Sequence, residues 1–356
     1  MLIFKKKILF NLYIYSWIIV FFFCEFSTNF ALSKNFSISK IEVEEAYDLN
    51  FNKTKVTDDA FKKAFKILIY KIVEYKDRSI IKNIKISEIK SLIENFSITN
   101  EKFINNNYNS EFEVQFNKKK ILNFLNNKGV VPSSPNEIKT FIIPVLIDST
   151  SNELFYLSQN IFYKNWDRSD KNHHLIKYVL PNEDIEDYSI IKKNINNIEN
   201  YNFKKIINKY NLKNEIILII LKSDSKLRVF SRLKFDKQKM LLNNIYNSSN
   251  IEQEINTIIL DIKNNYEDKW KSINKINTSI ELPIRISINS KNTKLSENFE
   301  NKLYLTDLVS DIKIEKFNSK EIIYRIIFNS TPNKFLDIMS LYNFKIDTAN
   351  EVWKLQ

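Results

Sequence analysis

Glycine is nearly absent from this sequence, because Gly129 is the only one among 356 residues. Loops that hold nucleotide phosphates need several glycines, since a residue without a Cβ lets the backbone come close to a phosphate. A Walker A loop, a dinucleotide-binding fingerprint and a Gly-x-Ser-x-Gly nucleophile elbow are therefore excluded. From the residues alone we expect no cofactor and assign no catalytic residue.

Cysteine is equally scarce, since Cys24 is the only one. It lies in an N-terminal segment that we expect to be removed, which would leave the mature chain without a thiol. Disulfides, thiolate nucleophiles and cysteine-based zinc sites are then excluded together. The bulky Phe23 before Cys24 also disfavours a lipoprotein processing site.

The excess of positive charge is spread along the chain. Lys and Arg number 54 against 42 Asp and Glu, and the only tight basic runs are residues 5–7 and 118–120. Proteins that bind nucleic acid concentrate basic residues on one face, often beside stacking aromatic residues. We therefore predict a solvated surface and no nucleic-acid partner.

The N-terminus has the layout of a secretory signal peptide, assigned to residues 1–33. Three lysines precede a mostly apolar run from Ile8 to Phe23, and small residues stand at Ala31 and Ser33. We predict cleavage between Ser33 and Lys34, which would place the protein in the periplasm or outside the cell. The alternative is an uncleaved inner-membrane anchor, which would be the protein's only contact with the membrane.

The remaining pattern predicts an α+β protein with three parts. Residues 34–135 form a β-α-α-β-β-α domain, in which Thr57 caps the first helix and an apolar helix face follows it. Residues 136–275 form a central α/β domain with a doubly buried strand at 140–148 and a long amphipathic helix at 251–270. Residues 276–356 form a β-α-β-β-α-β module of the ferredoxin-like kind.

A stretch in the central part, residues 163–188, holds both histidines and a cluster of four acids. Neighbouring histidines point in different directions, so we predict that His173 and His174 are exposed loop residues and not metal ligands. Asp184 and Asp187 follow Pro181 at the start of a predicted helix, where carboxylates satisfy free backbone N–H groups. Trp166 and Trp270 are predicted to be structural anchors.

Four segments carry a resemblance to a known family: the strand-strand-helix segment at 96–130, the segment "FIIPVLID…NELFYLSQNIFYKNW", "LPNEDIEDY", and the long helix followed by the terminal module. In their order and spacing they are similar to domain-of-unknown-function family 2066 (DUF2066), which comprises bacterial secreted proteins of the cell envelope. The family-motif positions matched here are Asn160, Trp166, Pro181, Asp184, Asp187, Trp270 and Trp353. In the second segment Ile161-Phe162 replace the family's Pro-Trp, and in the third Glu183 stands in a glycine position. The resemblance implies an envelope location and no known activity.

Together these observations favour a secreted, non-enzymatic module that binds an envelope protein or another envelope component. The alternative is an envelope hydrolase or transferase that uses the acidic region 183–187. For that reaction class, two carboxylates must face one cleft at about 5–10 Å.

Overall fold

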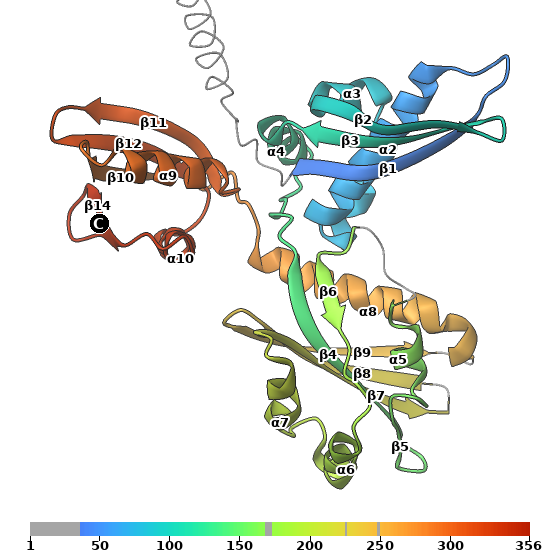
Figure 1. Cartoon of the computed structure of the whole chain (residues 1–356). Helices are drawn as coiled ribbons and strands as arrows, with labels where there is room; N and C mark the ends of the chain where they lie inside the picture. Colours follow the sequence, from blue (N-terminus) through green and yellow to red (C-terminus); the bar gives the residue numbers. More distant parts are fainter. Residues whose placement is uncertain (1–35, 168–172, 225, 248–249) are drawn as a thin grey trace, which may run out of the picture.

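The computed structural model describes residues 36–167, 173–224, 226–247 and 250–356. The predicted signal peptide and its cleavage point between Ser33 and Lys34 lie outside these residues. The α+β class is confirmed, because helices and strands occupy nearly equal shares of the chain and form several sheets (Figure 1). No helix among the described residues is long and apolar enough to cross a membrane.

The first sheet has three antiparallel strands in the order β1-β3-β2, with helix α2 against it. Alternation explains its inner face, since Phe112, Val114 and Phe116 of β3 are all buried. The elements of this region are β1 (Ser37–Ala46), α2 (Lys53–Ile72), the 3-10 helix η2 (Tyr75–Ile81), α3 (Ile86–Leu92), β2 (Ile93–Ile104), β3 (Asn107–Phe116) and α4 (Lys118–Asn127).

Helix α2 begins earlier than predicted, so the assignment of Thr57 as its cap is wrong. The Asn52 side chain accepts hydrogen bonds from the backbone N–H groups of Thr54 and Lys55. Thr57 lies inside the helix, where its hydroxyl donates to the Lys53 carbonyl. Asparagine caps a helix as well as threonine does, and here the cap, Asn52, lies upstream of Thr57 by more than one helical turn.

The second sheet has six strands, in the order β5-β4-β7-β8-β9, with β6 also pairing β4. Strand β4 is buried on both faces as predicted: Ile142 and Leu146 face one core, while Ile143 and Val145 face another. The strands are β4 (Ile138–Asp148), β5 (Glu153–Phe155), β6 (Ile176–Val179), β7 (Asn214–Ser223), β8 (Lys226–Phe235) and β9 (Gln238–Asn247).

Helices cover both faces of this sheet (Figure 1). The long helix α8 (Ile251–Ile273) and the short α5 (Ile161–Asn165) pack on one face. Helices α6 (Ile185–Lys193) and α7 (Lys204–Ile207) pack on the other, and the 3-10 helices η4 (Ile195–Asn197) and η5 (Asn208–Tyr210) follow them in the chain.

Two strands of this sheet lie where the sequence predicted none. Strand β6 lies in the stretch predicted as a loop, and its four residues form a strand because they pair in parallel with β4. Strand β9 is an edge strand that pairs with β8, and its outward side chains Leu241 and Ile245 are exposed. Its central asparagines hide the apolar alternation that marks a strand.

The third sheet has the order β11-β12-β10-β14-β13. Thr331 caps α10 with Pro332 at its first position, as predicted. The chain ends in two short strands, as predicted, but these two strands pair with each other antiparallel, and β14 runs parallel to β10. A plain ferredoxin-like module has one antiparallel last strand there. The elements are β10 (Leu282–Asn289), α9 (Thr293–Tyr304), β11 (Val309–Phe317), β12 (Glu321–Phe328), α10 (Pro332–Leu341), β13 (Ile346–Asp347) and β14 (Trp353–Leu355).

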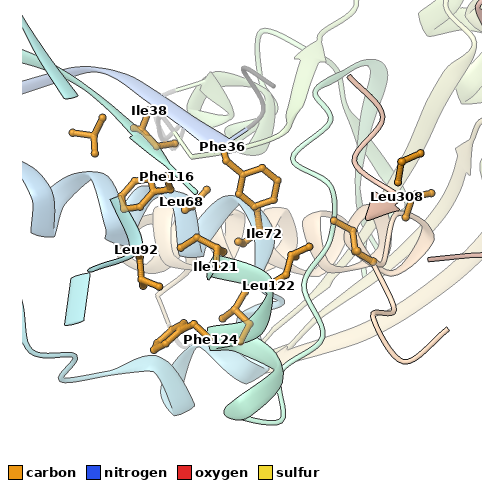
Figure 2. Close-up of a cluster of buried hydrophobic side chains, with 14 of the residues drawn as sticks. Phe36, Ile38, Leu68, Ile72, Leu92, Phe116, Ile121, Leu122, Phe124 and Leu308 are labelled. Carbon is orange, nitrogen blue, oxygen red and sulfur yellow. The ribbon is translucent and has the colours of Figure 1, made fainter. Parts of the chain in front are cut away.

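One hydrophobic core extends from the first sheet toward the third (Figure 2). Leu122 of α4 and Leu308, just before β11, belong to it. At the same place the Lys118 ammonium donates to the backbone carbonyls of Thr306 and Val309, at 3.4 and 3.2 Å. Because a partly buried ammonium needs such acceptors, these bonds hold the start of α4 against the start of β11.

Candidate functional site

The four predicted acids lie at the start of α6, on the face of the central sheet opposite α8. The Asp184 side chain caps the helix by accepting from the N–H groups of Glu186 and Asp187, as predicted. Lys209, from η5, donates to Asp184 and Asp187, with both Nζ–Oδ distances at 2.7 Å. Asp187 itself is buried and does not cap the helix.

These contacts stabilise the ionised carboxylates. The Lys209 ammonium lowers the pKa of Asp184, and Lys205 lowers the pKa of Glu186. Bonds from Ser158 lower the pKa of Glu183. Asp184 in turn raises the pKa of Lys209. A general acid needs a pKa raised toward neutral, so the lowered pKa values of Glu183, Asp184 and Glu186 do not fit that role.

The surroundings of α6 also leave little room for a substrate. The cavity that Asp187 lines, with Pro181 and Ile191, is only about 10 Å³. That is roughly the space of one water molecule. The ion pairs of the four-acid cluster with Lys209 and Lys205 instead hold η5 and α7 against the start of α6.

The prediction that both histidines are exposed is wrong, because His174 is 2% exposed and His173 is half-buried. The His173 ring lies edge-on to Tyr70, with ring centroids 4.6 Å apart. The pairing of β6 with β4 draws this stretch inward, against α8 and the end of α2. Within the described ranges, no group of three His, Cys, Asp or Glu side chains could hold a metal ion.

The matched asparagine and tryptophans have local roles. Asn160 is fully buried, caps α5 through its Oδ1 atom, and donates from Nδ2 to the Pro144 carbonyl at 3.0 Å. Trp270 donates from its indole N–H to the Asn136 carbonyl at 2.7 Å. Trp353 lies in β14 near the Phe335 ring. Trp270 also lines a cleft of about 350 Å³.

Helix α8 carries a row of buried charges that the sequence analysis missed. Lys263, Glu267 and Lys271 are each at most 1% exposed and are spaced four residues apart. The Lys263 ammonium donates to the Trp166 carbonyl at 2.7 Å and lies over the Trp166 ring. Glu267 accepts from the N–H groups of Leu175 and Ile176, both at 2.9 Å.

The C-terminal end of this row joins α8 to the first region of the molecule. Lys271 donates at 2.6 Å to the carbonyl of Tyr70, in the last turn of α2, and at 3.1 Å to the carbonyl of Val73, the residue that follows the helix. Asp268 accepts from the Tyr75 N–H at 2.8 Å. Burial raises the pKa of Asp268 and lowers the pKa of Lys271 to about 8. We call Lys263, Glu267 and Lys271 the charged row.

The sequence contained a signal for the charged row. Ile255 and Ile259 begin a line of residues spaced by four on the apolar face of α8, and the row continues that line. Charged residues on an apolar helix stripe indicate a buried polar contact with another segment.

A large cleft lies between the first and third sheets. It measures about 980 Å³ and is lined by α4, the ends of β2 and β3, and the first half of β11. Among its walls are Glu94, Lys119, Asn123, Ser310 and Lys313. Its place between two sheets is one where binding sites often occur.

Compared with known proteins, the chain matches no protein-family model and no curated protein.

Proposed function

We propose that this protein is a non-enzymatic interaction module of the bacterial cell envelope, resembling DUF2066, which binds an extended segment of a partner protein in the cleft between its first and third sheets. The signal-peptide layout and the family resemblance support the envelope location. The cleft supports the binding role, and the partnered acids of α6 disfavour the hydrolase or transferase alternative.

The observation that carries the proposal is the position of β11. This strand pairs only with β12 among the described strands, so it is an edge of the third sheet. Its residues Val309, Ser310, Asp311 and Lys313 also line the cleft. An edge strand beside a cleft offers free backbone groups to which an extended segment adds as a further strand.

Charges on β11 add selectivity to this edge. Lys313 is exposed, and its Nζ atom lies 3.2 Å from Oδ2 of Asp311. The Nζ atom of Lys316 lies 3.1 Å from Oε1 of Glu321 on the neighbouring strand β12. Charged side chains on an edge strand discourage indiscriminate pairing with other strands. A partner segment with complementary charges overcomes that barrier, and a random strand does not.

Site-specific photocrosslinking in intact cells tests the proposal. A photoreactive residue is placed at Ser310, which lines the cleft, or at Asn301, an exposed position on α9 outside it. We expect a defined envelope protein to be captured from position 310 and not from position 301. Equal capture from both positions, or no capture while a control envelope complex is captured, contradicts the proposal.

A further inference from the structure

A second groove, on the first region of the molecule, has a different chemistry. It measures about 650 Å³ and lies between α2, η2 and α3. Five of its lining residues are cationic and none is acidic: Lys62, Lys66, Lys76, Arg78 and Lys82. Its apolar lining residues are Phe65, Ile69, Ile81, Ile84 and Ile89.

Local acids leave part of this positive charge without a counterion. Lys62 pairs with Asp59, and Lys76 pairs with Glu74. Lys66 and Lys82 are exposed and form no ion pair with any other residue that the structure describes. A concave surface with unmatched cations attracts anionic groups more strongly than the same charges on a flat surface.

Two tyrosines fix the central cation. The Arg78 guanidinium lies 4.5 Å from the Tyr70 ring centroid and 5.4 Å from that of Tyr75. It also donates to the carbonyls of Val73 and Tyr70. Because the guanidinium is held in place before any ligand arrives, it loses little side-chain entropy on binding.

We propose that this groove binds an extended protein segment in which acidic and apolar side chains alternate. The unmatched cations would pair with the acidic side chains, and the isoleucines and Phe65 would contact the apolar ones. The apolar lining disfavours a purely polyanionic ligand, and the concave shape disfavours a planar membrane surface. This inference is independent of the proposed function, because it concerns a different surface.

Fluorescence anisotropy with a short labelled peptide of alternating Glu and Leu tests this inference. The matched peptide has Gln in place of Glu, and the variant protein carries Lys66→Glu and Lys82→Glu. A control protein carries Lys102→Glu and Lys291→Glu, at exposed lysines on β2 and before α9. Thermal melts confirm that both variants remain folded.

We expect the Glu peptide to bind wild-type and control proteins at least about tenfold more tightly than the Gln peptide. The Lys66→Glu/Lys82→Glu variant should lose at least about tenfold in affinity for the Glu peptide, and added salt should weaken wild-type binding. Four results overturn the proposal: no binding of the Glu peptide tighter than about 1 mM, equal binding of the two peptides, unchanged binding by the groove variant, or binding of anionic phospholipid vesicles without binding of the peptide.

Discussion

The acids of α6 and the charged row of α8 lie on opposite faces of the same sheet, and they differ in their sequence spacing and in their burial. The α6 acids are clustered in sequence and, apart from Asp187, are exposed or half-exposed. The charged row is spread over nine residues and is buried throughout. The α6 acids are easy to notice in the sequence because they are adjacent. We expect the charged row to contribute more to the free energy of unfolding because it is buried.

The largest expected effect comes from Glu267→Ala. The change leaves the buried N–H groups of Leu175 and Ile176 without their acceptor and removes a negative charge beside Lys271. We expect a loss of about 4 kcal/mol in the free energy of unfolding, measured by urea denaturation. Thr257→Ala, on the exposed face of the same helix, should change it by less than about 0.5 kcal/mol. A loss at Glu267 no larger than this control would refute the structural role of the charged row.

Lys271 should give the row a distinctive pH dependence. Its pKa is about 8 in the folded protein against an ordinary value of 10.5, so the unfolded chain binds more protons between those two pH values. Stability contributed by this group therefore rises with pH from about 8 to 10.5. The difference in unfolding free energy between wild type and Lys271→Met should grow in favour of wild type by on the order of 3 kcal/mol over that window. A difference that stays flat across the window would contradict the lowered pKa.

The α6 acids should show smaller effects. Asp184→Ala removes the helix cap and one partner of Lys209, and we expect a loss of about 1 kcal/mol in unfolding free energy. Asp184→Asn, which keeps a capping oxygen, should recover most of that loss. If the two variants are equally unstable, the cap contributes little and the ion pair with Lys209 dominates.

The smallest effect is expected at Glu186. Its ion pair with Lys205 is exposed on both sides, so Glu186→Gln should change the unfolding free energy by less than about 1 kcal/mol. Raising the salt concentration should reduce even that difference, because exposed charges are screened. A larger, salt-independent loss would show that Glu186 has a role that the contacts of α6 do not explain.

Much of the fold could be predicted because long apolar patterns report burial directly. Strand β4 is apolar at nearly every position, and α8 repeats isoleucine at helical spacing. Strands β6 and β9 escaped prediction because their conformation depends on their neighbours. Strand β6 has only four residues and forms by pairing with β4. Strand β9 is an edge strand with polar central residues and forms by pairing with β8.

The candidate sites were less predictable than the fold. The Asp184 cap follows from a local pattern of proline and acids, and the structure contains it. The burial of His174 depends on contacts with segments that are distant in sequence. The cleft beside β11 and the basic groove are each formed by several elements, so no single stretch of sequence reveals them.

Hydrogen–deuterium exchange of the mature protein, alone and with the partner captured from position 310, tests most directly whether binding occurs at the cleft and not at the acids. We predict that binding slows amide exchange in β11 and α4 and leaves exchange in α6 unchanged. Slower exchange centred on Ile185–Lys193, with β11 unaffected, would contradict the account.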